Sequence, residues 1–308
     1  MAIVAVAGGT GDVGRTIVDQ LVATGRNPIV LCRKKVPSET RTNGLKFLAV
    51  NYDNVDQTAK TLEAHRVDTV ISAMNIEGPS ERAQLNLIAA ADTSQTTRRF
   101  IPSDFAGYAP VGETDEDEMT GPGLRAAEAL AKSGLTFTRV ANGMFMDYFG
   151  LPNVSSHLRP FKWAVNVPAR TAAIPGTGNE KFSVTYSKDV ARFLDRLLDE
   201  PEWQEWSIVS GADICLNELV ALSEKITGEK FNVTHDSEED LANGKATLIF
   251  DDSASYNGMD PTVMSAMLGL SVVQGKILLP KDGRLNDKFP VIQPKSVESL
   301  MTEAWSTK

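Results

Sequence analysis

The first half of the chain alternates short apolar runs with longer segments in which apolar residues recur every three to four positions. Val13, Ile17 and Leu21 have the spacing of one helix face, directly after the apolar run Ile3–Ala7. Apolar runs without alternating polar residues are typical of parallel strands that are covered on both faces. The pattern predicts strands at 3–7, 28–32, 45–50, 67–72, 99–102 and 135–141, and helices at 54–64, 79–92 and 121–133. This order predicts an α/β fold with a doubly wound, Rossmann-type parallel sheet.

The pattern changes after residue 150. Residues 151–178 are rich in proline and glycine and show little periodicity. A helix is predicted over Ser187–Leu198, with Ser187 as its N-cap, and another over Leu216–Thr227, ended by Gly228. A short strand is predicted at Ser207–Val209. We expect a sheet domain over 1–150, to which 182–211 return, and a smaller interleaved C-terminal domain formed by 151–181 and 212–308.

A glycine-rich loop joins the first predicted strand to the first helix. Gly8, Gly11 and Gly14 have the spacing G-x-x-G-x-x-G. In such a loop the first glycine permits a sharp turn, the second a close approach to a pyrophosphate, and the third close packing of helix on strand. The free N–H groups at the helix N-terminus attract the anion. The loop predicts a dinucleotide site, and the residues at the helix entrance that we expect to contribute are Thr10, Asp12 and Val13.

The end of the second predicted strand favours NADP(H) over NAD(H). An NAD site places a carboxylate here, whereas this chain has VLCRKK, with Arg33, Lys34 and Lys35. A guanidinium can bind a 2′-phosphate through two hydrogen bonds, so Arg33 and Lys34 are the expected contacts, and Lys35 fits a solvated loop cation. Other expected cofactor contacts follow later strands and are Asn51, Ser72, Ala73, Ser103 and Asn142. Asp104 fits either a ribose contact or a turn cap.

Composition excludes several classes of function. The formal net charge is −9 with no long basic run, so nucleic acid is not an expected partner. No run of eighteen apolar residues predicts a membrane span, and the apolar N-terminus leads directly into the glycine loop, as a strand does. Two distant cysteines without a CxxC motif predict reduced thiols and a cytoplasmic location. The three histidines are isolated, so no metal site is expected.

Two catalytic signatures are absent from the sequence. No Gly-x-Ser-x-Gly motif occurs, which argues against serine hydrolase chemistry. None of the five tyrosines is followed four residues later by lysine, so the Tyr-x-x-x-Lys pair of ordinary short-chain dehydrogenases is missing. The chemistry must therefore be sought in other motifs.

Four further motifs together resemble the NmrA-like and isoflavone-reductase-like family of atypical short-chain dehydrogenases, in its fungal form. They are VAGGTGDVG, RRFIPSDFAGY, GLTFTRVANGMFMDYFG and IPGTGNEKFSVTYSKDVARFLDRLLD, and the likeness extends to about residue 245. The resemblance implies an NADPH-dependent reductase of an aromatic or polyketide-type small molecule, bound between the sheet domain and the smaller domain. It also implies that the segment after the sixth strand lines the site. The expected substrate contacts are Tyr108, Phe145 and Met146, although Phe145 and Met146 also fit core packing.

The chain departs from the family at the position of its general acid/base. The family's lysine lies eleven residues before the glycine that matches Gly134, and this chain has Gly123 there. We expect the missing side chain to leave open space, in a helix entrance with a conformation that favours glycine. The catalytic group is therefore unknown, with Tyr108, Tyr148 and Lys162 as candidates. Two alternatives stay open: an NADP(H)-sensing regulator that binds a partner protein, and a non-redox isomerase or cyclase. The acidic run at 113–118 fits a surface loop or a lid.

Overall fold

Six parallel strands form the largest sheet of the structure, a computed structural model that describes residues 2–33, 44–76, 78–112, 120–250 and 259–306. The strand order is β3-β2-β1-β4-β5-β6, and every neighbouring pair is parallel. The strands are β1 (Ile3–Ala7), β2 (Ile29–Cys32), β3 (Lys46–Ala49), β4 (Val67–Ser72), β5 (Arg99–Ile101) and β6 (Thr136–Phe137). The order reverses between β1 and β4, which is where doubly wound folds bind ligands. The predicted fold class is confirmed.

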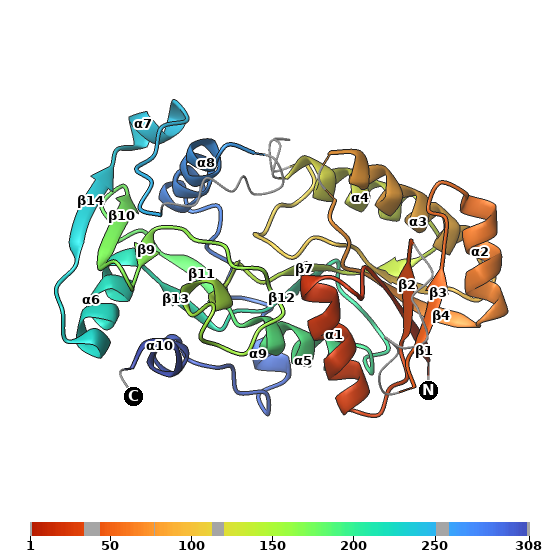
Figure 1. Cartoon of the computed structure of the whole chain (residues 1–308). Coiled ribbons are helices and arrows are strands. Elements are labelled where there is room, and N and C mark those ends of the chain that lie inside the picture. The colour runs from red at the N-terminus through yellow and green to blue at the C-terminus, as the bar shows by residue number, and fades with distance from the viewer. Residues whose placement is uncertain (1, 34–43, 77, 113–119, 251–258, 307–308) are drawn as a thin grey trace. The chain divides into compact units, whose positions relative to one another are not determined.

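Helices cover both faces of this sheet. α2 (Val55–Ala64), α3 (Glu81–Thr93) and α4 (Gly121–Ala131) pack side by side on one face, and α1 (Asp12–Ala23) lies on the other (Figure 1). Arg26, which follows α1, bonds to Asp195 of α5 (Ser187–Leu197) through Nε and to the Asp195 carbonyl through Nη2 at 2.9 Å. The four inner strands, β1, β2, β4 and β5, are mostly apolar and buried, as their unalternating sequences predict, whereas the edge strands β3 and β6 are partly exposed.

The single strand predicted over 135–141 is wrong, because two strands occupy this segment. β6 ends at Phe137, and β7 (Arg139–Ala141) leaves the large sheet to pair with β12 (Trp206–Ile208). Thr138 marks the change, since its hydroxyl lies 2.8 Å from the Ser207 hydroxyl. The apolar run is continuous through this point, so periodicity alone carries no signal of the change in partner. A short 3-10 turn, Gly78–Ser80, similarly precedes α3, which begins at Glu81 rather than at Pro79.

The chain divides into two units, and each is described here by itself. The first consists of residues Met1–Phe105, Ala109–Ala141 and Ala191–Ser207, and the second of Ala106–Tyr108, Asn142–Val190 and Ile208–Lys308. The segments of the first unit end at Phe105, Ala141 and Ser207, and each unit is drawn from three segments of the sequence. The predicted domains, with boundaries at 150, 181 and 211, stay a prediction.

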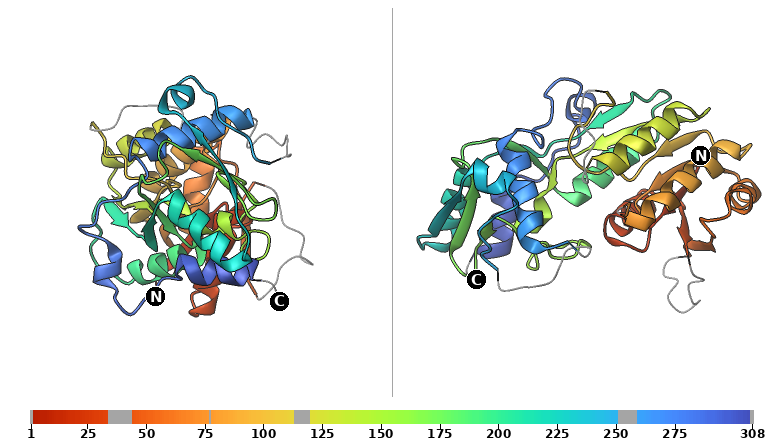
Figure 2. Two further views of the ribbon diagram at one scale, coloured as in Figure 1. Left: turned by 90° about the vertical axis from the view of Figure 1, so that its left-hand side faces the viewer. Right: turned by 90° about the horizontal axis from the view of Figure 1, so that it is seen from above.

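The second unit is built on two small three-stranded sheets. One has the order β14-β10-β9 and the other β13-β11-β8. Their strands are β8 (Met144–Phe145), β9 (Val165–Asn166), β10 (Thr171–Pro175), β11 (Phe182–Thr185), β13 (Ala212–Ile214) and β14 (Asn232–Asp236). The helices are α6 (Leu216–Thr227), α7 (Glu238–Ala242), α8 (Pro261–Val273), α9 (Leu285–Lys288) and α10 (Val297–Trp305). Figures 1 and 2 show α7 and α8 on one side of the β14-β10-β9 sheet and α6 with α10 on the other.

A buried carboxylate anchors the second unit. Asp147, which has no exposed surface, accepts hydrogen bonds from the Ser156 hydroxyl at 2.5 Å, the Ser187 hydroxyl at 2.6 Å and the Ser187 N–H at 2.8 Å. Burial raises the pKa of Asp147, and these hydrogen bonds counteract the rise. Ser187 was expected to cap its own helix. In the structure it is the first helical residue, and Asp147 satisfies its N–H instead.

We predict that Asp147→Ala lowers the free energy of unfolding by about 2–4 kcal/mol, because three donors lose their acceptor inside the unit. Urea unfolding, followed by circular dichroism, measures the change. The control is Asp199→Ala, which removes a half-exposed carboxylate from its ion pair with Arg26 and is expected to change stability by less than about 1 kcal/mol. Equal losses in the two variants would contradict the anchoring role.

Candidate functional site: a dinucleotide loop and an apolar pocket

The glycine loop packs closely against the backbone that follows β4 and against its own first residue. Gly8 has a φ of +75°, and a Cβ there would lie 2.4 Å from the carbonyl oxygen of Ala73, which follows β4. A Cβ on Gly14 would lie 2.2 Å from the Gly8 carbonyl oxygen. Gly11 is the N-cap of α1 and provides no side-chain cap. The first turn of α1 therefore presents backbone N–H groups and the positive end of the helix dipole toward the loop.

The adjacent glycine, Gly9, is not one of the three glycines of the predicted motif. A Cβ at Gly9 would lie 3.0 Å from Val30 Cγ1 and 3.1 Å from Val18 Cγ2, so this position lets the loop pack against β2 and α1. The double glycine in VAGGTG was the available signal. The remaining loop residues are open to a ligand: Thr10 is exposed, and Asp12 and Val13 are half-buried.

Residues expected at the adenosine end lie after β2 and β3. Arg33 is exposed directly after β2, and Lys34 lies outside the described residues. Asn51 is exposed, and its side-chain oxygen accepts the Asp53 N–H at 3.1 Å in a local turn. The amide of Asn51 thus has a fixed orientation at the carboxyl end of β3, which is on the ligand side of such sheets.

Several buried polar atoms near these strand ends have no hydrogen-bond partner among the residues that the structure describes. In the first unit these atoms include Ser72 Oγ, at the end of β4, and Gln84 Nε2, on α3. The Gln84 oxygen accepts the Ser103 N–H at 2.8 Å, and the Ser103 hydroxyl donates to the Met74 carbonyl at 2.7 Å. Unpaired buried donors are rare because each costs about 1–3 kcal/mol. Such groups fit a polar ligand such as NADP(H), which would lie along the strand ends. Gln84 had no sequence signal, since it reads as an ordinary helix residue.

The expectation of open space beside Gly123 is wrong. A Cβ there would lie 2.5 Å from Asp104 Oδ1, so the Asp104 carboxyl already fills the place. The Asp104 carboxylate accepts a hydrogen bond from Arg139 Nε at 2.6 Å, and Arg139 Nη1 donates to the Ala109 carbonyl at 2.8 Å. The guanidinium of Arg139, which is fully buried, also lies 4.1 Å from the centre of the Trp206 ring.

Two further expectations concern the same residues. Gly123 does not have a positive φ, so its conformation is open to other residues and the constraint is steric. Asp104 was expected to contact a ribose or cap a turn; its carboxyl pairs with Arg139, and the ribose contact stays a prediction. Burial raises the pKa of Asp104, and the Arg139 guanidinium counteracts the rise. A side chain at position 123 must therefore displace a buried charge pair.

The second unit holds the other candidate residues. Asn142 is buried after β7 and donates through Nδ2 to the Gly143 carbonyl at 2.9 Å, while its Oδ1 has no partner. Met146 has no exposed surface and packs in the core of this unit, and Tyr108 is half-buried. Phe145 is 7% exposed and contacts Tyr148 edge-on, with ring centres 6.2 Å apart. Asn142 and Phe145 thus flank the start of the segment that carries Tyr148.

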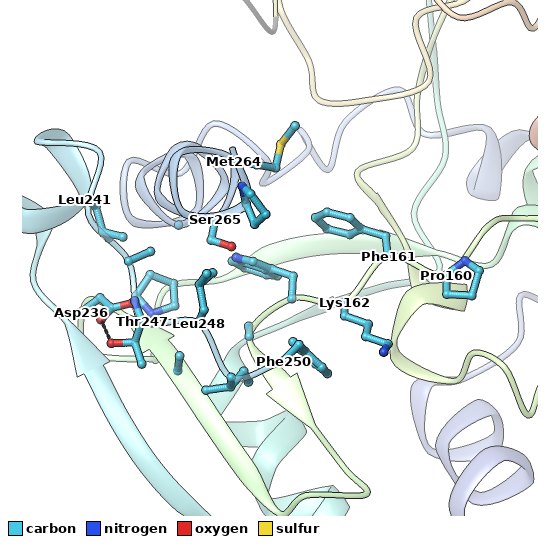
Figure 3. A pocket seen from close by; sticks show the side chains of 18 residues that line it. Pro160, Phe161, Lys162, Asp236, Leu241, Thr247, Leu248, Phe250, Met264 and Ser265 are labelled. Atoms are coloured by element: carbon cyan, nitrogen blue, oxygen red, sulfur yellow. Dashed lines mark hydrogen bonds between the residues drawn. The ribbon is translucent and has the colours of Figure 1, made fainter. Parts of the chain in front are cut away.

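An aromatic contact links Tyr148 to a pocket in the second unit. The rings of Tyr148 and Phe161 lie 5.3 Å apart, and Phe161 lines a cavity of about 130 Å³ between α8, β10 and residues 246–250 (Figure 3). Its walls combine polar and apolar surface, and the apolar side chains include Phe161, Trp163, Leu241, Leu248, Phe250 and Met264. Its charged lining residues are Lys162 and Asp236. Lys162 Nζ is 5.7 Å from the Phe250 ring, and Asp236 accepts the Thr247 hydroxyl at 2.6 Å and its N–H at 2.9 Å.

The predicted residues fall into two groups, one in each unit. The glycine loop, Ala73, Ser72 and Ser103 lie at the strand ends of the first unit, and Tyr148 and Lys162 lie at or beside the pocket of the second. The acidic run at 113–118 lies outside the described residues. Within the described parts of the chain, no group of three or more His, Cys, Asp or Glu side chains could hold a metal ion. No helix of the described structure is long and apolar enough to cross a membrane.

Comparison with known proteins identifies the family. Residues 2–271 match the model of the NmrA-like family, so the chain belongs to it. The chain is 37% identical over 233 residues to oxidoreductase BOA1 of Botryotinia fuckeliana, covering 75% of this chain and 78% of that protein. It is 29% identical to oxidoreductase swnN of Metarhizium robertsii, covering 100% and 98%. The family resemblance and its fungal form are confirmed.

Solved structures share the fold. The binary complex of leucoanthocyanidin reductase and NADPH from Vitis vinifera has a TM-score of 0.77 and 22% identity, covering 98% of this chain and 99% of that one. AtPrR2 with NADP⁺ and (+)-pinoresinol has a TM-score of 0.72 and 21% identity, covering 98% of both chains. The likeness extends the fold assignment over nearly the whole chain.

We predict that Gly123→Ala lowers stability by about 2–3 kcal/mol, since the new methyl group must displace the Asp104–Arg139 pair. Gly123→Lys is expected to be at least as destabilising and to give no tenfold gain in turnover. Chemical unfolding measures the first effect. The matched control is Gly134→Ala, whose Cβ would have only an ordinary contact, 3.6 Å from Asp92 Oδ1. A stable, more active Gly123→Lys enzyme would refute this account of the site.

Proposed function

We propose that this protein is an NADPH-dependent reductase of an apolar aromatic or polyketide-type small molecule. The observation that carries the cofactor assignment is the glycine loop, where Gly8 and Gly14 permit backbone approaches that no other residue allows. The uncapped start of α1 suits the pyrophosphate. The buried Ser72 Oγ and Gln84 Nε2, which have no hydrogen-bond partner among the described residues, suit the ribose and nicotinamide parts. The relatives named oxidoreductases and the related fold bound to NADPH support the same assignment.

The preference for NADPH over NADH follows from the end of β2. Arg33 stands there, exposed, where an NAD-specific site has a carboxylate. A guanidinium suits a phosphate because its parallel N–H groups match two phosphate oxygens. The Arg33 side chain would hold the 2′-phosphate at the carboxyl end of the strand.

The pocket of the second unit is the proposed place of one substrate ring. An apolar cavity of about 150 Å³ is large enough for benzene, so a cavity of about 130 Å³ accommodates about one ring. Phe161 and Trp163 provide aromatic walls, and Ser265 adds a hydroxyl on α8. The binding of an aromatic compound by AtPrR2 supports a substrate of this kind.

The bound cofactor supplies a hydride for an electrophilic carbon of the substrate. The protein would orient that carbon by holding the substrate ring against the aromatic walls of the pocket. A proton for the reduced group is available at the pocket from the ammonium of Lys162, with the Tyr148 and Tyr108 hydroxyls as the other candidates in the second unit. Reduction of a cationic carbon such as an iminium needs no such donor, because the hydride alone completes the bond.

A second candidate function is a regulator that binds NADP(H) without turnover. The observation that favours it is the filled position at Gly123, since the Asp104 carboxyl excludes the family's lysine. A non-redox reaction on the same fold stays a third possibility. Turnover with added substrates separates the reductase from both.

We predict tighter binding of NADPH than of NADH, and loss of most of this preference in Arg33→Ala. The loss should be about 10-fold to 100-fold in NADPH affinity, because a hydrogen-bonded charge pair contributes about 1.5–3 kcal/mol. Titration calorimetry with both cofactors measures the effect. The control is Arg170→Ala, at an exposed ion pair of the second unit, which should leave both affinities unchanged. Equal affinity for the two cofactors in the parent protein would rule out the NADP assignment.

We also predict NADPH oxidation with at least one compound from a panel of quinones, enones and imines. Ser265→Phe should raise the KM for that compound at least tenfold, because the new ring fills the pocket. Absorbance at 340 nm follows the reaction, and calorimetry should show unchanged NADPH affinity. Val263→Phe is the matched control, on the same helix but 39% exposed and outside the pocket lining. No turnover with any compound, together with capture of a partner protein, would favour the regulator.

A further inference from the structure

A buried tyrosine hydroxyl without a partner lies near the proposed 2′-phosphate position. Tyr52 follows β3, is 6% exposed and packs into the core of the first unit with Leu31 and Val50. Its hydroxyl is buried and has no hydrogen-bond partner in the described structure. Because an unsatisfied buried hydroxyl costs free energy, phenylalanine would be the better residue for packing alone.

The neighbours of this hydroxyl belong to the end of β2. Val50 N–H donates to the Cys32 carbonyl at 2.9 Å, which continues the pairing of β2 with β3 up to the residues beside Tyr52. Burial raises the pKa of the Tyr52 phenol, and the nearby Arg33 guanidinium partly opposes the rise. The Cys32 thiol itself faces the Leu48 carbonyl at 3.5 Å. Tyr52 therefore shares its surroundings with the cation proposed to hold a phosphate.

Burial raises the pKa of Tyr52 well above its ordinary value. The phenol consequently stays neutral at all working pH values and remains a hydrogen-bond donor. A phosphate monoester has only acceptor oxygens at neutral pH, so a neutral phenol and a guanidinium form a compatible pair of donors for it. A ribose with a free 2′-hydroxyl offers no such charge to either group.

We propose that Tyr52 donates a hydrogen bond to the 2′-phosphate of the cofactor and, together with Arg33, determines the preference for NADPH over NADH. This inference rests on the proposed NADP(H) binding and adds a residue that the sequence motifs do not indicate. Arg33 is exposed and can move aside from the phenol to admit the phosphate. The phosphate then provides the acceptor that the hydroxyl lacks.

The test is Tyr52→Phe, which removes a single oxygen atom. In the cofactor-free protein this change should leave the melting temperature unchanged or raise it, because an unsatisfied group is lost. The Kd for NADPH should rise about tenfold, as expected for a hydrogen bond to a charged group, while the Kd for NADH stays within about twofold. Calorimetry with NADPH, NADH and 2′,5′-ADP measures binding without substrate, so the result does not depend on turnover.

The matched control is Tyr186→Phe in the second unit. The Tyr186 hydroxyl bonds to the Ser155 carbonyl, so the same substitution there should lower the melting temperature and leave NADPH affinity unchanged. The double variant Arg33→Ala/Tyr52→Phe should lose less affinity than the two single losses combined, because both side chains bind one phosphate.

Three results would overturn the inference. The first is a lower melting temperature of cofactor-free Tyr52→Phe with unchanged NADPH affinity, which would give Tyr52 a structural role. The second is an equal loss of NADPH and NADH affinity, which would mean that Tyr52 supports the cofactor site without contacting the 2′-phosphate. The third is equal binding of both cofactors by the parent protein, which would remove the preference itself. The first two results leave the NADPH preference and the turnover of the parent protein intact, so failure of this inference and failure of the proposed function are distinguishable.

Discussion

The first unit depends on the close approach of three pieces of backbone at the glycine loop. The chain turns from β1 into α1 directly against the residues that follow β4. A Cβ at Gly8 or Gly14 would lie within 2.4 Å of a backbone carbonyl oxygen. The Ala73 N–H donates to the Ala7 carbonyl at 2.8 Å, so the end of β4 is fixed against the end of β1. Because these strands meet at the point where the sheet order reverses, this contact fixes the two strand ends beside the glycine loop.

A second constraint explains the departure from the family at Gly123. A buried arginine needs a nearby anion, since an unpaired buried charge costs several kcal/mol. Asp104 supplies that anion and occupies the space beside α4, so the glycine at 123 and the arginine at 139 depend on each other. Arg139 also holds the Ala109 carbonyl, so the pair fixes both ends of the short stretch that contains Tyr108. The missing lysine is thus part of a rearranged set of contacts rather than an isolated loss.

The parts of the fold that local sequence determines were predictable. Strands β1 and β4 have the predicted bounds, and Gly228 ends α6 in the left-handed conformation, with φ +72°. The division of residues 135–141 into two strands was not predictable, because Thr138 changes the partner of a continuous apolar run. Asp147 capping Ser187 across 40 residues was equally invisible. Both depend on long-range contacts, for which apolar periodicity carries no information.

The same distinction holds for the candidate site. A phosphate loop is a local structure, so Gly8, Gly11 and Gly14 reveal it, whereas the pocket combines residues from 160–164, 173–175, 236–250 and 261–269. Residues such as Gln84 and Tyr52 look like helix or core residues in the sequence, and only their unpartnered buried atoms single them out. A buried polar atom without a partner marks a place where packing alone does not account for the residue. Where such atoms gather at the carboxyl ends of parallel strands, a bound cofactor is the partner that would satisfy them.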